Sequence, residues 1–469
     1  MNKAAYSFIA FLTFVLIFIG PWPVDNTPFE ATKYAQQTFN EIDKLSFSKN
    51  ASDIKAGYAK RDITPPIGGP IGGYSARTPK INTGSYESVF VKAVTIKNSE
   101  SSVTIVNSET LLPLPEFVIA VTKKSGLQRR ELFFTSTHTH SGPGGYASGF
   151  IAKQTLGDFS PAYFSFLVDK TTEAILESRK TLAPVELNYR NVSLSIELSD
   201  KLLTNQLQPK KNPYSKLQLL HIVSKTNHKA VATLVTFSAH PTFFGQKNKK
   251  ISGDYPALLT QKIESELGGG AIFIPGAVGG TLAKINGGNS SGQPKVSNLQ
   301  RHEYAQALFA IVRSALMENS NIGKKQSLTF SIATINSLLL PVELPQPNFR
   351  ISDNFRLSPL LVNAIFHGQS SYIQVLTFGQ LALFAFPADY SGELASDLDR
   401  YALKQGISTW VTSFNGDYLG YLTPSRLYSL NHHITRDNNI YGPFGGDYFN
   451  KVSKKMINKI KNSEQKTLR

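Results

Sequence analysis

The sequence predicts an α/β fold with mixed, largely parallel sheet layers, flanking helices and a functional site at the carboxyl ends of the strands. Three observations support this prediction. Segments with strand character alternate with segments of helical periodicity along the chain. From residue 54 onward neither an internal repeat nor a shift in composition marks a boundary. Finally, five of the strands run directly into polar or glycine-rich sequence.

The individual elements follow from hydrophobic periodicity. Short apolar runs rich in β-branched and aromatic residues predict strands at residues 89–96, 103–106, 131–135, 230–237, 271–274, 381–386 and 409–414. Apolar residues at three- and four-residue spacing predict helices at residues 162–182, 256–267, 301–317, 392–405 and 448–460. We expect the region 54–469 to form one domain.

The overall composition is that of a globular protein. The chain has 469 residues, of which 41% are hydrophobic and 17% charged, and this balance excludes a disordered chain. Its formal charge of +16 indicates either a basic soluble surface or attraction to an anionic membrane. Nucleic-acid binding is not expected, because the Lys and Arg residues are scattered along the chain. The absence of cysteine excludes disulfides, thiolate metal sites and a cysteine nucleophile.

The first residues have the pattern of an export signal. Lys3 precedes an apolar run over residues 4–19, which Gly-Pro-Trp-Pro closes at residues 20–23. No small-x-small cleavage site follows, and the run is short beside the roughly 20 apolar residues of a spanning helix. We therefore predict an uncleaved signal anchor over residues 1–23. The acidic residues Asp25 and Glu30 beyond it favour an extracytoplasmic body, periplasmic or on the cell surface.

Between this anchor and the main domain, residues 24–53 are predicted to form a juxtamembrane helix and a linker. Ala35, Phe39 and Ile42 have helical spacing within residues 31–45. Residues 46–53 are polar and typical of a linker.

Five predicted strands lead into loops of unusual composition. These loops are His-Thr-His-Ser-Gly-Pro-Gly-Gly at 138–145, His-Pro-Thr at 240–242, Pro-Gly-Ala-Val-Gly-Gly at 275–280, Pro-Ala-Asp at 387–389 and Asn-Gly-Asp-Tyr-Leu-Gly-Tyr at 415–421. Sites in open α/β sheets form beyond the carboxyl ends of the strands. We therefore expect the five loops to meet at one pocket, and residues 286–289 to form a flexible loop over it.

The side chains in these loops suit a metal site. His138 and His140 project to the same side of an extended backbone, about 7 Å apart, as two ligands or as a ligand and a base. Taken singly, His240, Asp389 and Tyr421 are equally typical of a core histidine, a turn aspartate and a half-buried tyrosine. Together, imidazole, carboxylate and phenol are ligands suited to Zn²⁺ that leave a position for water. Zinc lowers the pKa of that water to around 7.

Several motifs resemble those of one enzyme family, the neutral/alkaline non-lysosomal ceramidases. Residues 54–66, Ile-Lys-Ala-Gly-Tyr-Ala-Lys-Arg-Asp-Ile-Thr-Pro-Pro, with Gly-Gly-Tyr at 72–74, resemble the start of that family. The loop at 138–145 resembles its most distinctive motif. The loops at 240, 387 and 415, and Tyr-Gly-Pro at 441–443, follow in the family's order. The resemblance implies a ceramidase-like catalytic domain over residues 54–469.

The resemblance also implies roles for single residues. His138 and His240 would bind zinc, Asp389 stands where the family has a glutamate ligand, and Tyr421 where it has a tyrosine ligand. His140 would lie beside the zinc and assist at the reacting carbonyl. The family cleaves the amide bond of N-acylsphingosine. We therefore expect a membrane-tethered, zinc-dependent hydrolase acting on an N-acylated lipid or a small amide.

Two departures from the family pattern keep alternatives open. Asp389 is one methylene shorter than glutamate. Gly279, within Gly-Ala-Val-Gly-Gly-Thr at 276–281, replaces the serine assigned as catalytic in the family. Water activated by zinc, with His140 as proton shuttle, is then the expected nucleophile, and Thr281 is the alternative nucleophile. The remaining alternatives are a zinc hydrolase of a non-sphingolipid amide or ester and a catalytically inactive, surface-anchored binding protein.

One further acidic residue has two interpretations. Asp254 precedes the predicted helix at 256–267 and is expected at or near its N-cap. Its other predicted role is to support His240 from outside the ligand set.

Overall fold

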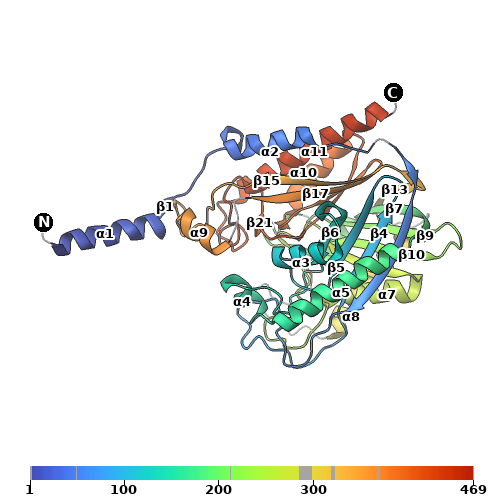
Figure 1. Cartoon of the computed structure of the whole chain (residues 1–469), viewed down its shortest axis with the longest axis horizontal. Helices are drawn as coiled ribbons and strands as arrows, with labels where there is room; N and C mark the ends of the chain where they lie inside the picture. The colour runs from blue at the N-terminus through green and yellow to red at the C-terminus, as the bar shows by residue number, and fades with distance from the viewer. Residues whose placement is uncertain are drawn as a thin grey trace.

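The fold consists of two sheets packed face to face, with helices on both outer sides (Figure 1). The computed structural model describes residues 3–48, 50–211, 213–284, 298–317, 323–366 and 370–467. The loop predicted at 286–289 therefore lies outside the described residues.

The large sheet is mixed and has the strand order β11-β10-β9-β7-β3-β4-β5-β6, with β13 also paired to β7. Its strands are β3 (Lys55–Asp62), β4 (Phe90–Lys97), β5 (Ser102–Ser108), β6 (Leu132–Ser136), β7 (Ala183–Leu194), β9 (Lys216–Ser224), β10 (Ala230–Phe237), β11 (Gly270–Pro275) and β13 (Gly323–Phe330). The small sheet has the order β15-β17-β18-β20, with β15 (Ile335–Glu343), β17 (Ser370–Phe378), β18 (Leu381–Ala385) and β20 (Ser408–Thr412).

Short strand pairs complete the β structure, and helices cover the sheets. The pairs are β1 (Trp22–Pro23) with β16 (Phe355–Arg356), β2 (Ser52–Asp53) with β14 (Ile332–Ala333), β8 (Leu203–Asn205) with β12 (Thr281–Ala283), and β19 (Asp389–Tyr390) with β21 (Tyr421–Leu422). The α-helices are α1 (Lys3–Phe18), α2 (Lys33–Lys44), α3 (Pro115–Ser125), α4 (Phe150–Leu156), α5 (Pro161–Lys180), α6 (Ile196–Leu202), α7 (Asp254–Leu267), α8 (Asn298–Leu316), α9 (Pro359–Phe366), α10 (Gly392–Leu403) and α11 (Gly445–Thr467). The 3₁₀ turns in the described part of the chain are η1 (Phe29–Ala31), η2 (Arg129–Glu131) and η3 (Ser425–Leu427).

The main core lies between the two sheets. Leu234 of β10 and Trp410 of β20 belong to this inter-sheet core, and the Trp410 indole donates to the Thr236 hydroxyl across it. On the opposite face of β10, Val235 and Phe237 pack under α7 and α8. Because β10 is covered on both faces, its sequence is a nearly continuous apolar run. The helices α3 and α5 cover the rest of the large sheet, while α2, α10 and α11 cover the small one.

The α/β class with mixed sheets is confirmed, but the sheets contain more antiparallel pairing than predicted. The parallel pairs are β5–β6, β10–β11 and β18–β20, together with the short pair β19–β21. The long strands β7, β9, β15 and β17 pair antiparallel and were not predicted. In β7, half-buried residues alternate with buried ones, a weaker signal than an unbroken apolar run.

The N-terminal region is a projecting helix followed by a segment packed on the body. Residues 3–18 form α1, with none of its residues buried. Within the described residues, no helix is both long and apolar enough to cross a membrane. The helix expected at 31–45 forms as α2, and its residues Ala35 and Ile42 lie in the core beside the small sheet.

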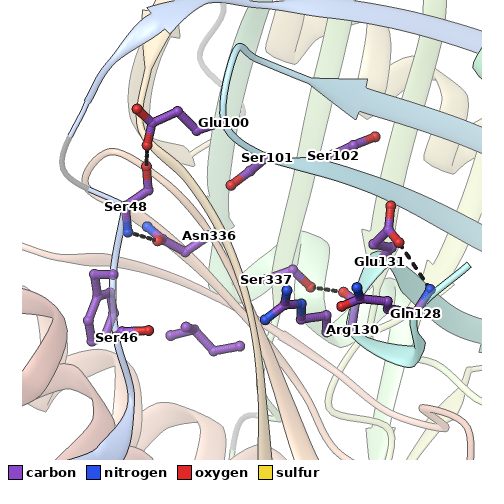
Figure 2. Close-up of a pocket in the computed structure, with 12 residues that line it drawn as sticks. Ser46, Ser48, Glu100, Ser101, Ser102, Gln128, Arg130, Glu131, Asn336 and Ser337 are labelled. Carbon is purple, nitrogen blue, oxygen red and sulfur yellow. Dashed lines mark hydrogen bonds between the residues drawn. The ribbon is translucent and has the colours of Figure 1, made fainter.

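The predicted linker is also held against the body, at a polar pocket of about 460 Å³ (Figure 2). The Ser48 backbone N–H donates to Asn336 Oδ1 at 2.6 Å, and its hydroxyl donates to Glu100 at 2.7 Å. Across the pocket the Ser337 hydroxyl donates to the Arg130 carbonyl. Residues 52–53 then form β2, paired to β14.

Candidate metal centre

The strand-end loops meet, as the sequence predicted. Parallel strands β10 and β11 end at one sheet edge, and β18 and β20 likewise end together. His240 follows β10 and bridges to Leu282 of β12, while Asp389 opens β19. The parallel pairing of β19 with β21 places Asp389 opposite Tyr421.

Three buried side chains form a cluster that can hold a metal ion. One ligand atom from each of His138, His240 and Asp389 lies within 4.8 Å of the other two. His240 Nε2 is 2.9 Å from Asp389 Oδ1, yet neither atom has a hydrogen-bond partner among the described residues. Buried polar atoms are rarely left unpaired. Two such atoms facing one another, with a second imidazole beside them, fit a cation between them.

In His138 and His240 the Nδ1 atoms, which point away from the cluster, already have hydrogen-bond partners. His138 Nδ1 lies 2.9 Å from the Leu111 carbonyl, and His240 Nδ1 lies 3.1 Å from the Thr281 carbonyl. A carbonyl only accepts, so each Nδ1 carries the proton and each Nε2 keeps a free lone pair. Metal-binding histidines are commonly oriented in this way.

The pKa values of His138 and His240 are shifted in opposite directions. Burial and the neighbouring His140 hold the pKa of His138 well below its usual range. Burial also disfavours the charged form of His240, but the adjacent Asp389 carboxylate outweighs it and raises the pKa of His240. The carboxylate is thus the negative group at the centre of the cluster.

The backbone at His138 differs from the prediction. The extended conformation expected for the His-Thr-His motif is wrong there, because His138 has a φ of 61°. Its ring stacks on Phe414, with ring centroids 3.7 Å apart and planes 10° from parallel. The left-handed turn aims both imidazoles at one point, so that their Nε2 atoms are 3.2 Å apart. A packing contact from a distant loop sets this geometry, and a local pattern does not reveal it.

His140 lies beside the cluster and outside its three donors. Burial, followed by the nearby His240 and Arg77, lowers the pKa of His140 to about 3, so its imidazole is neutral. Its Nδ1 is buried without a hydrogen-bond partner among the described residues. The Tyr74 ring packs against it at 4.9 Å.

Two tyrosines of the 415–421 motif contact the cluster. The predicted ligand Tyr421 has its ring 6.4 Å from that of His240, at 16° to it. The Tyr418 hydroxyl donates to Asp389 Oδ2 at 2.8 Å, a contact that sequence reasoning missed. Burial and the charge of Asp389 raise the pKa of both phenols. The one signal for Tyr418 was its position inside the same motif.

Asp254 and Thr281 support His240 through hydrogen bonds that involve backbone atoms. Asp254 is the first residue of α7, next to its N-cap Gly253, and accepts from the Phe243 N–H at 3.0 Å and the Tyr255 N–H at 2.7 Å. It therefore fixes the loop that follows His240. Thr281 supplies the carbonyl that orients His240.

Gly279 is fixed by close contact with the loop that carries Asp389. Its N–H donates to the Tyr390 carbonyl at 2.9 Å. A Cβ at this position would lie 2.6 Å from the Asp389 carbonyl oxygen and 2.9 Å from the Tyr390 carbonyl carbon. A serine does not fit here without moving Asp389.

A segment that sequence reasoning left without a role connects both histidine loops. Buried Arg77 donates from Nη2 to the His140 carbonyl at 2.8 Å and from Nε to the Gln246 carbonyl at 3.3 Å. Tyr74 donates to the Thr242 carbonyl at 3.5 Å. At Gly73, whose φ is 126°, a Cβ would lie 2.2 Å from the His140 carbonyl oxygen. Residues 72–77 are called the histidine clamp below.

Comparison with known proteins identifies the family. Residues 54–302, more than half of the chain, match the family described as neutral/alkaline non-lysosomal ceramidase, N-terminal. The chain belongs to this family.

Particular relatives agree with this assignment. The neutral ceramidase of Mycobacterium tuberculosis (strain ATCC 25618 / H37Rv) is 29% identical over 148 residues, which are 30% of this chain and 23% of that protein. The neutral ceramidase structure from Pseudomonas aeruginosa has a TM-score of 0.72 at 18% identity, covering 88% of this chain and 75% of that one. A structure of ceramidase complexed with C2 has a TM-score of 0.70 at 16% identity, covering 87% and 75%. At these identities the structures establish the fold.

Proposed function

We propose that the protein is a zinc-dependent hydrolase that cleaves the amide bond of an N-acylated, ceramide-like lipid. The observation that carries this proposal is the pair of buried, unpaired atoms His240 Nε2 and Asp389 Oδ1, 2.9 Å apart, with His138 beside them. Family membership supports the reaction class. Imidazole nitrogens and a carboxylate are a donor set suited to zinc.

In this proposal His138, His240, Asp389 and Tyr421 hold the ion. When bound, zinc would polarise the amide carbonyl and lower the pKa of water. The Leu111 and Thr281 carbonyls keep the two histidines in the tautomer that leaves Nε2 free. Tyr418 donates to the second oxygen of Asp389 and so orients its carboxylate.

We propose that His140 moves the proton. Its imidazole is neutral, and its Nε2 faces the donor cluster. Water attacks the carbonyl carbon and the neutral imidazole of His140 accepts the proton. The C–N bond then breaks as this proton passes to the amine nitrogen, giving a carboxylic acid and an amine. Gly279 supplies no side-chain nucleophile, so water fills that role.

We also propose that α1 tethers the protein to a membrane, with the body outside the cytoplasm. The apolar helix, its first residue Lys3 and the acidic residues Asp25 and Glu30 beyond it motivate this topology. Protease added to intact cells should degrade the body. Recovery of the protein from the cytosol would contradict the topology.

The direct test of the zinc proposal is metal analysis of the purified full-length chain. We expect about one zinc per chain, lost in His138→Ala and in His240→Ala but retained in the control His221→Ala. His221 is a suitable control because it bonds Thr233 on the large sheet, outside the cluster. A wild-type chain without metal, or a metal-replete His240→Ala, would contradict the site.

Substrate assays separate the alternatives. The proposal requires release of fatty acid from N-acylsphingosine by the zinc-loaded wild type. Cleavage only of a different amide or of an ester would favour a non-sphingolipid hydrolase. Zinc and lipid binding without turnover would favour a binding protein.

A further inference from the structure

Besides α1 itself, an exposed apolar surface lies at the end of the molecule from which α1 projects. Phe150 and Ile151 of α4 and Leu360 and Ile365 of α9 have 71%, 37%, 50% and 37% of their surface exposed. We call these four residues the α4–α9 face. The two helices pack beside each other, and both lie at the end of the body nearest α1 (Figure 1). Gathered exposed apolar residues indicate an interaction site more strongly than single ones do.

This face is joined to the N-terminal helix by the backbone. The Ser358 N–H donates to the Ile19 carbonyl at 2.9 Å, and its hydroxyl donates to the Ile17 carbonyl at 2.7 Å. Two residues before Ser358, Arg356 pairs with Trp22 across β1 and β16. α9 begins at the next residue, Pro359, and has no charged residue. It therefore starts where α1 ends.

The face is also joined to the metal centre. α4 follows the loop that contains His138 and His140, and the Gly145 N–H of that loop donates to the Leu156 carbonyl of α4 at 2.8 Å. The Gly73 N–H of the histidine clamp donates to the Thr155 carbonyl at 2.9 Å. A surface that contacts α4 consequently lies beside the segments that position His140.

We infer that the α4–α9 face rests on the surface of the lipid bilayer that holds α1, and that the lipid substrate reaches the metal centre from this side. The inference rests on the proposed tether and lipid substrate. A short helix with an apolar side and no charge is suited to the boundary between headgroups and acyl chains. The net charge of +16 adds attraction to anionic lipids. The bilayer is favoured as occupant because α1, apolar and exposed along its length, leaves the body at this face.

Site-specific labelling tests the contact independently of catalysis. Because the chain has no cysteine, Phe150→Cys, Leu360→Cys and the control Ile332→Cys can each take one environment-sensitive fluorophore. Ile332 is 59% exposed but lies on β14, where it pairs with Asp53 of β2. The full-length proteins are mixed with vesicles of phosphatidylcholine and phosphatidylglycerol. We expect a blue shift at positions 150 and 360, quenched by nitroxide-labelled lipid, and no shift at 332.

The remaining outcomes contradict the inference in distinguishable ways. Vesicle-bound protein with unshifted labels at 150 and 360 would show that α1 binds while the face stays in water. A shift that depends on protein concentration without vesicles would show that a second copy covers the face. Protein that stays in the supernatant would contradict the tether as well. A second assay uses Phe150→Asp with Leu360→Asp, which should reduce hydrolysis of N-acylsphingosine in vesicles but not of a short soluble N-acyl amide.

Discussion

At the scale of single residues, the sequence predicted which side chains come together but not what orients them. His138, His240 and Asp389 follow strands whose apolar character is strong, so their convergence was predictable from strand ends. The stacking of His138 on Phe414 and the bond from Tyr418 to Asp389 join segments far apart in the chain. Contacts of this kind leave no local pattern, and so the left-handed His138 and the role of Tyr418 were missed.

The proposed proton transfer can be tested at His140. His140→Ala should lower turnover by about 10² to 10⁴, the usual contribution of general acid–base help, while zinc is retained. Thr281→Ala should leave turnover near normal, because the carbonyl of Thr281 and not its hydroxyl contacts His240. Steady-state kinetics with metal analysis distinguishes the two. An inactive Thr281→Ala with intact zinc would instead assign the nucleophile to its hydroxyl.

A second residue-scale prediction concerns Gly279. Restoring the family's serine should weaken the site, because a Cβ would lie 2.6 Å from the Asp389 carbonyl oxygen. We expect Gly279→Ser to lower the free energy of unfolding by about 1–3 kcal/mol, as overpacking usually does, and to reduce zinc affinity. Gly445→Ser is the control, since its Cβ would meet Tyr441 at an ordinary 3.4 Å. Higher activity with unchanged zinc affinity in Gly279→Ser would refute this account.

At the scale of elements, the strands with the most apolar sequences were predictable, whereas β7 and β9, which have polar residues spread along them, were not. The predicted strand at 230–237 coincides with β10, and the helix at 162–182 differs from α5 by one or two residues at each end. The antiparallel strands β7 and β9 were missed, although they form the centre of the large sheet. The predicted excess of parallel pairing followed from this omission, because the predicted strands are mainly those of the parallel pairs.

The histidine clamp gives an element-scale prediction. Arg77 donates to backbone carbonyls of both histidine loops, so Arg77→Met would leave buried carbonyls unpaired. We expect a loss of stability on the order of 3 kcal/mol and lower turnover with zinc still bound. Arg77→Lys keeps the charge without the planar donor geometry. Its stability and turnover should therefore lie between those of the wild type and Arg77→Met. Thermal unfolding and steady-state kinetics of the three proteins test this prediction. If Arg77→Met had the turnover of the wild type, the clamp would not position His140.

The start of α7 predicts a pH dependence. Burial raises the pKa of Asp254 from 3.8 to about 6, so the folded state binds this proton more tightly than the unfolded state does. The contribution of Asp254 to stability is therefore full below pH 4 and is lost as the pH rises to about 6, a change of about 2–3 kcal/mol. Urea unfolding should show Asp254→Asn gaining stability relative to the wild type across this range. A difference that does not vary with pH would contradict the shift.

At the scale of the whole molecule, the layers position the site and the N-terminal helix stands apart from them. The inter-sheet core, the helices on both outer sides and α2 form one continuous body, whereas α1 buries none of its residues. Removing residues 1–18 should therefore release the protein from membranes, with only a small fall in its thermal unfolding temperature and no change in its zinc content. This small loss of stability comes from two hydrogen bonds, from the Ser358 hydroxyl to the Ile17 carbonyl and from the Trp22 indole to the Leu16 carbonyl. Membrane fractionation, calorimetry and metal analysis of the truncated and full-length chains measure these three properties. A truncated protein that still sediments with membranes would place the tether elsewhere in the chain, and one that no longer folds would show that α1 belongs to the body.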